Sequence, residues 1–143
     1  MPDIAFLSTA HTHTESFLNA VSEKDGCRVA AIWDDMESRG QSFANAHGAD
    51  YSADLDAIIG RGDIDGFIIC AENTRHLPLL KAAIPRKLPI FCEKSFTTSV
   101  DDALEVVSLI GEHEAVVHMG YFQPFSAEMQ GVIAHVNSGA LGY

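Results

Sequence analysis

Two histidines that could take part in chemistry lie close together near the start of the chain. His11 and His13 form an H-x-H pair shortly after the apolar run Ile4–Leu7. Two imidazoles at this spacing on a loop can bind a metal ion together with a third ligand. No cysteine or acid stands at a recognised metal-ligand spacing from them, so we expect no metal site. The pair could instead line a ligand cleft as general acid/base or hydrogen-bonding groups, or make only local hydrogen bonds.

The same loop has the position of a phosphate-binding turn. In a βαβ unit, the turn after the first strand places backbone N–H groups at a helix N-terminus, where they bind a pyrophosphate. Glycines usually occupy three positions of this turn, and here Ser8, Ala10 and His13 stand in their places. Ser8 and Ala10 are small enough for a close backbone approach, but His13 is not. Taken alone, the turn favours an ordinary strand–helix connection over a dinucleotide site.

Two neighbouring acids, Asp34 and Asp35, follow the apolar run Val29–Trp33. An acid at the tip of the second strand of a dinucleotide-binding unit, about 20 residues or more beyond the turn, binds the adenosine ribose hydroxyls. Such an acid repels a 2′-phosphate, so Asp34 favours NAD over NADP as the cofactor. An aspartate that caps the following helix is an equally weighted alternative.

An acid and a base, Glu93 and Lys94, follow the apolar run Ile90–Cys92. Ligands of parallel sheets bind at the carboxyl ends of the strands, which is where these two residues are expected to lie. A lysine there can hold a carbonyl, hydroxyl or phosphate oxygen, and a neighbouring acid can orient it. A surface ion pair is the alternative.

The elements that would position these residues can be predicted from the hydrophobic pattern. Five short runs are continuously apolar: Ile4–Leu7, Val29–Trp33, Phe67–Cys70, Ile90–Cys92 and Ala115–Val117. Continuous apolar strands are covered on both faces, which is typical of a parallel sheet. Between and after them, apolar residues recur at helical spacing, and a capping box at Thr12 and Glu15 predicts the start of the first helix. The pattern predicts an α/β protein with a doubly wound parallel sheet in three layers, α/β/α.

Composition excludes several classes of partner. The chain has 143 residues, the length of one domain, with 20 acids against 9 bases and a formal charge of −11. This charge repels nucleic acid and anionic membrane surfaces. No apolar stretch is long enough for a membrane helix, the start resembles no signal peptide, and the three cysteines match no metal spacing. We therefore expect a cytoplasmic protein with reduced cysteines, and neither nucleic acid nor membrane as a partner.

Four segments resemble the N-terminal half of the Gfo/Idh/MocA oxidoreductases, the group of glucose–fructose oxidoreductase and inositol dehydrogenase. Asp65–His76 is similar to the fourth strand of the family and its N-x-x-H turn. Phe91–Phe96 resembles the E-K-P motif, with serine in place of proline. His118–Phe125 resembles the glycine-tyrosine segment after the sixth strand, and Ser138–Gly142 resembles the S-G-x-I-G turn that enters the second domain.

The resemblance implies an NAD(P)-binding Rossmann domain over residues 1–120. Residues 121–143 are then expected to start the connection to a second α/β domain, which is absent from this chain. The reaction of the family is hydride transfer between a nicotinamide and a sugar or polyol carbon. By position, the resemblance implies this cofactor site: Ser8, Thr9, Ala10 and His11 at the pyrophosphate; Asp34 and Asp35 at the adenosine ribose; Ala71, Asn73 and His76 in the middle; Glu93 and Lys94 near the nicotinamide. Lys94 is also the catalytic candidate of this chain, and His13 and Tyr121 are candidates on the substrate side.

Departures from the family pattern limit what we expect of the chain alone. The glycine turn is degraded, Pro124 stands where many members carry an arginine, and the catalytic histidine and acid of the family lie in the second domain. We expect at most weak binding of NAD(H) and little turnover, and an exposed apolar face could drive homo-oligomers. A non-catalytic Rossmann module for a nucleotide or CoA-like ligand is the alternative. A degenerate member kept for protein–protein contact would bind no nucleotide.

Overall fold

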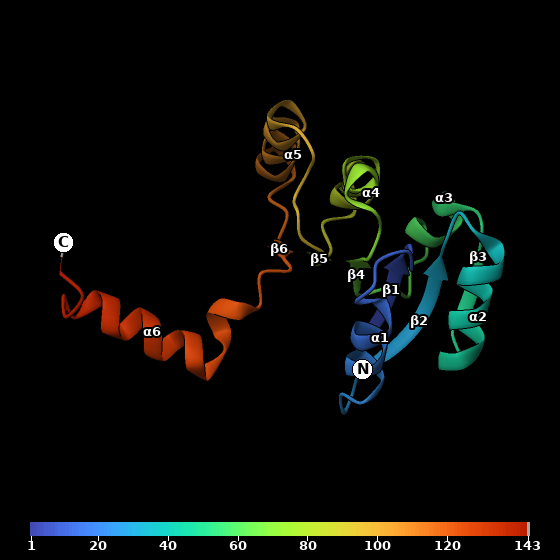
Figure 1. Cartoon of the computed structure of the whole chain (residues 1–143). Helices are drawn as coiled ribbons and strands as arrows, with labels where there is room; N and C mark the ends of the chain where they lie inside the picture. The colour runs from blue at the N-terminus through green and yellow to red at the C-terminus, as the bar shows by residue number, and fades with distance from the viewer. Residues whose placement is uncertain (143) are drawn as a thin grey trace.

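The computed structural model describes residues 1–142, which form a six-stranded parallel sheet in the order β3-β2-β1-β4-β5-β6 (Figure 1). The strands are β1 (Asp3–Leu7), β2 (Arg28–Trp33), β3 (Asp50–Ser52), β4 (Gly66–Ile69), β5 (Ile90–Cys92) and β6 (Val117–Met119). This order, with helices between the strands, confirms the predicted Rossmann fold.

Helices α1 to α5 connect consecutive strands, and α6 follows the last strand. They are α1 (Thr14–Ser22), α2 (Glu37–His47), α3 (Leu55–Ile59), α4 (His76–Ala83), α5 (Val100–His113) and α6 (Ala127–Asn137), with single 3₁₀ turns η1 (Asn73–Arg75), η2 (Ile84–Arg86) and η3 (Gln123–Phe125). None of the helices among residues 1–142 is both long enough and apolar enough to span a membrane.

The apolar strand residues divide between two core clusters, because successive side chains point to opposite faces of the sheet. Phe6 packs in one cluster with Leu18 of α1 and Ala44 of α2. Ala5 and Leu7 pack in the other, which includes the buried side chains of α3, α4 and α5. Both sides of β1 are therefore covered, which explains its continuous apolar run.

The predicted start of the first helix is wrong by one residue, and that of the last strand is wrong by two. Helix α1 begins at Thr14, and its N-cap is His13, so Thr12 forms no capping box. The carbonyl of His11 accepts a hydrogen bond from the Thr14 amide, which places Thr12 in a turn before the helix. Strand β6 begins at Val117, because Glu114 has a left-handed φ of 53° and Ala115 donates back to the end of α5.

The sheet is less covered at β4 and β5 than at β1 and β2. Phe17, Ile68, Ile90, Phe91 and other apolar residues line an open groove of about 760 Å³ on the face that carries α1. Helix α6 extends away from the sheet at the end of the chain (Figure 1), and none of its residues is buried.

Candidate functional site

The predicted site residues come together at the carboxyl edge of the sheet. The turn after β1 contacts both neighbouring strands: the Ser8 amide donates to the Trp33 carbonyl of β2, and the His11 amide donates to the Cys70 carbonyl after β4. The Glu93 amide after β5 donates to the Ile69 carbonyl of β4. Ligands bind at this edge in doubly wound sheets, at the point where the strand order reverses between β1 and β4.

The turn after β1 has the backbone of a glycine turn without the glycine. Ser8 is buried and has a φ of 70°, in the left-handed region that favours glycine. Its hydroxyl accepts a hydrogen bond from the Ala10 amide at 3.3 Å. The amide of Thr9 donates to Asp34, and that of His13 donates to His11 Nδ1. Several donors of the turn are therefore already paired within the protein, and a phosphate would have to replace these bonds.

Asp34 is fully buried, and both of its carboxylate oxygens are occupied. Oδ2 accepts from the Thr9 amide at 2.7 Å, the Thr9 hydroxyl and Arg39 Nε, and Oδ1 accepts from the Met36 amide and Arg39 Nη2. Burial alone raises the pKa of Asp34, but the hydrogen bonds from Arg39 and Thr9 outweigh it and hold the pKa below its usual value. Asp34 thus joins the turn after β1 to the start of α2.

The exposed charges beside Asp34 are also paired. Asp35 accepts from Arg39 Nη2 at 3.2 Å and lies 3.0 Å from Arg75 Nη2. Sequence reasoning missed both arginines. The spacing of Asp35 and Arg39, four residues apart at a helix start, was the available signal. Arginines at this edge matter because they can accommodate the 2′-phosphate of NADP.

Glu93 meets the H-x-H pair at the other end of the turn. Its carboxylate is fully buried, with Oε1 2.6 Å from His13 Nδ1 and 3.8 Å from His11 Nδ1. Oε2 accepts from the Lys94 amide at 2.7 Å. Burial lowers the pKa of His11, and the nearby Glu93 opposes this only in part. The structure therefore supplies the acid that no local spacing could assign to the two histidines.

The remaining predicted residues have varied surroundings. Ala71 and His76 are buried, Lys94 is half-buried, and Asn73 and Tyr121 are exposed. His76 Nδ1 lies 2.6 Å from the Ser95 carbonyl and Nε2 lies 3.2 Å from the Ala71 carbonyl. Both ring nitrogens thus face backbone, so His76 joins the segments after β4 and β5.

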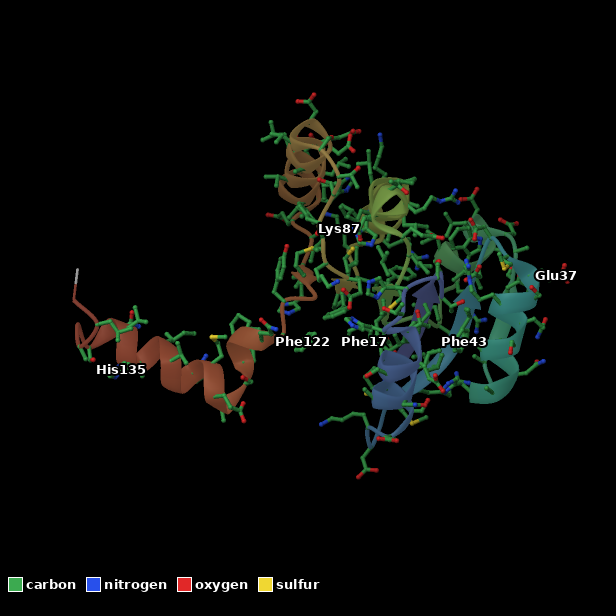
Figure 2. All side chains as sticks on the ribbon, in the orientation of Figure 1. Phe17, Glu37, Phe43, Lys87, Phe122 and His135 are labelled. Atoms are coloured by element: carbon green, nitrogen blue, oxygen red, sulfur yellow. The ribbon has the colours of Figure 1, made fainter. Side chains whose placement is uncertain are left out.

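The segment after β6 packs against the end of β5. The Gly120 amide donates to the Cys92 carbonyl at 2.8 Å, and a Cβ on Gly120 would lie 3.3 Å from the Glu93 Cα and the Lys94 nitrogen. Two residues further on, the Phe122 ring lies 6.5 Å from the His13 ring. Figure 2 shows Phe122 and Phe17 near each other at this side of the molecule, and both line a small hollow that includes His13.

A family model and a curated relative both match most of this chain. A family model described as "Oxidoreductase family, NAD-binding Rossmann fold" matches residues 8–121. Inositol 2-dehydrogenase 1 of Mycolicibacterium vanbaalenii is 29% identical over 142 residues, which is 97% of this chain and 41% of the relative.

Solved structures show the same fold. A myo-inositol dehydrogenase from Corynebacterium glutamicum aligns with a TM-score of 0.86 at 24% identity, over 100% of this chain and 43% of that one. Biliverdin reductase from Synechocystis, solved with biliverdin and NADP⁺, aligns with a TM-score of 0.80 at 15% identity, over 94% of this chain and 42% of that one. The chain thus spans about two fifths of the length of these relatives. The family resemblance expected from the four motifs is confirmed: the chain belongs to the GFO_IDH_MocA oxidoreductase family, and it carries the NAD-binding Rossmann fold of that family.

Proposed function

We propose that the chain is the cofactor-binding part of an oxidoreductase that transfers hydride between a nicotinamide and a sugar or polyol carbon. The observation that carries the proposal is the turn Ser8–His11, which has a glycine-like backbone and lies between β1 and the N-terminus of α1. Relatives named inositol 2-dehydrogenase support a polyol as the substrate class. Residues 121–143 would then begin the connection to a substrate domain, as expected from the sequence.

The residues present fit a dinucleotide along this edge. Ser8 and Ala10 are small enough for a pyrophosphate to approach the backbone of the turn, where it would replace the internal hydrogen bonds of the Thr9 and Ala10 amides. Asp35 lies exposed where an adenosine ribose would be held. At the other end, Glu93 orients the Lys94 backbone, and the Lys94 ammonium would hold the oxygen of the reacting carbon. When bound, the nicotinamide accepts or donates the hydride.

We also propose NAD over NADP, although the reason differs from the one that the sequence offered. Asp34 is saturated by Thr9, Met36 and Arg39, so the exposed carboxylate at this end is that of Asp35. Both Arg39 and Arg75 are already paired with it. A 2′-phosphate would have to break these ion pairs and approach two carboxylates.

The test is a titration of the chain with NADH and, in parallel, with NADPH, followed by nicotinamide fluorescence and calorimetry. Saturable binding of NADH, with weaker binding of NADPH, supports the proposal. Little turnover is expected even then, because catalysis requires the reacting carbon to be held against the nicotinamide in a closed site. Absence of binding of either at millimolar concentration contradicts it.

A second candidate function is a non-catalytic module for another nucleotide or a CoA-like ligand. The turn fits such a module because Ser8, Ala10 and His13 stand in place of the usual glycines, so it departs from the common NAD-binding pattern. Binding of ADP-ribose or CoA with the same affinity as NADH would support this candidate.

The proposed protein is located in the cytoplasm and forms homo-oligomers. The three cysteines are free, and burial raises the pKa of the Cys70 thiol to about 12, which makes it unreactive and suits a reducing cytoplasm. The apolar groove beside Phe91 supports homo-oligomers. A monodisperse monomer in light scattering would contradict self-association.

A further inference from the structure

We propose that His11, His13 and Glu93 form a binding site for one divalent transition-metal ion of the zinc or iron(II) class. The local spacing of the histidines predicts no such site, because the third ligand comes from a segment 80 residues away. The inference does not depend on nucleotide binding, since it concerns only the side chains of this chain.

The three side chains are already close enough to share one ion. Their ligand atoms lie within 4.8 Å of one another. In a tetrahedral site with bonds of about 2.0–2.1 Å, the ligand atoms are about 3.3 Å apart. The His13 Nδ1–Glu93 Oε1 distance of 2.6 Å would widen by less than an ångström, and the His11 Nδ1–Glu93 Oε1 distance of 3.8 Å would shorten by about half an ångström. The His11 Nδ1 lone pair would exchange its hydrogen bond from the His13 amide for the bond to the metal ion.

The charge around Glu93 favours a cation. Among residues 1–142, no lysine or arginine forms an ion pair with this fully buried carboxylate, whose side-chain partners are the two imidazoles. A buried charge without a counter-charge is costly, and a bound cation supplies one. Two imidazole nitrogens and one carboxylate oxygen suit zinc and iron(II), and they leave a coordination position open to water.

The surroundings provide both support and access. The Lys94 amide holds Glu93 Oε2, and the His11 amide is fixed to the Cys70 carbonyl at 2.9 Å. A ligand carboxylate that accepts a hydrogen bond with its second oxygen is typical of metal sites, and the bond of the His11 amide fixes the backbone from which that imidazole extends. His13 is 40% exposed and borders the hollow lined by Phe17 and Phe122, so an ion can enter from solvent.

The experiment uses the whole untagged chain after treatment with a chelator. Co²⁺ is titrated by its visible absorption, and Zn²⁺ by calorimetry. We expect one equivalent to bind, with at least tenfold weaker affinity in His13→Ala and in Glu93→Gln. His135→Ala on α6 is the control, because this histidine is exposed and far from the cluster, and its affinity should equal that of the parent. Circular dichroism verifies that each variant is folded, and the half-exposed position of His13 makes His13→Ala the safer variant.

Two results would overturn the proposal. One is the absence of binding at about 1 mM metal ion, a concentration well above the Kd of a specific metal site. The other is unchanged affinity in both ligand variants, which would place the metal on other histidines. NADH titrations of the metal-free parent are scored separately, so failure of the metal site and failure of the proposed function can be distinguished.

Discussion

Two buried carboxylates at the same edge of the sheet differ in how completely they are paired. Asp34, after β2, accepts five hydrogen bonds, from Thr9, Met36 and the cation of Arg39. Glu93, after β5, is equally buried, yet its partners are one backbone amide and one close imidazole. Asp34 therefore stabilises the fold, whereas Glu93 retains the capacity to bind a ligand. Burial alone does not distinguish the two roles, but the number and charge of the partners does.

The largest expected effect comes from removing the charge of Asp34. Asp34→Asn leaves the Arg39 guanidinium and the Thr9 hydroxyl facing an amide, and should lower the free energy of unfolding by about 3–4 kcal/mol. Urea denaturation at pH 7 measures it. A loss below about 1 kcal/mol would mean that Asp34 is no more important than an exposed ion pair.

The same carboxylate predicts a pH dependence. Because the pKa of Asp34 is lowered in the folded state, its contribution is present above the unfolded value of about 3.9 and is lost as the pH falls through the folded pKa. The difference in stability between the parent and Asp34→Asn should therefore shrink in acid. A constant difference from pH 7 to pH 2 would argue against this assignment.

The matched substitution of the other carboxylate, Glu93→Gln, should lower the free energy of unfolding by less than Asp34→Asn does. Glu93→Gln keeps an acceptor for the Lys94 amide and removes a buried charge that no lysine or arginine balances, so we expect a loss of less than about 1.5 kcal/mol in urea denaturation. If Glu93→Gln destabilises as much as Asp34→Asn, the two carboxylates are equivalent and the comparison fails.

Asp35→Ala tests the exposed end of the site. The change releases Arg75 and one contact of Arg39, so affinity for NADPH relative to NADH should rise about fivefold, or about 1 kcal/mol. Parallel fluorescence titrations measure the ratio. Stability should change by less than about 0.5 kcal/mol, since the pair is exposed. An unchanged ratio would show that these arginines do not reach the ribose.

The smallest expected effect lies at Ser8. Ser8→Gly removes the cost of a left-handed side-chain residue, which exceeds the entropy cost of glycine, so stability should rise by about 0.5 kcal/mol. The change also frees the Ala10 amide for a phosphate, and NADH affinity should rise with it. Weaker NADH binding in a stable Ser8→Gly variant would show that the serine hydroxyl itself contacts the nucleotide.

The sequence predicted the sheet where burial on both faces leaves a continuous apolar run, as in β1 and β2. It did not mark β3, a three-residue strand at the sheet edge. The start of β6 depended on the left-handed Glu114, which no pattern of apolar residues encodes. Boundaries of this kind are decided by backbone geometry at single residues.

The position of the site was predictable from the sequence, but the hydrogen-bond and ion-pair partners of its residues were not. Parallel strands bring their carboxyl ends to one edge, so residues such as Ser8, Asp34 and Glu93 could be placed there together. The sequence could not show that Arg39 saturates Asp34, or that Glu93 reaches His13 across β4. Those contacts depend on the register of strands far apart in the chain, which local spacing does not contain.

The open groove beside Phe17 and Phe91 affects how folding of this protein should be monitored. Dyes that bind exposed apolar surface, such as ANS, should fluoresce with the native chain, although their fluorescence is often taken as a sign of a molten globule. Trp33 provides an independent signal, because this single tryptophan is buried and its indole donates to the Ala53 carbonyl at 3.0 Å. Near-ultraviolet circular dichroism of Trp33 therefore distinguishes a folded, dye-binding chain from a loosened one.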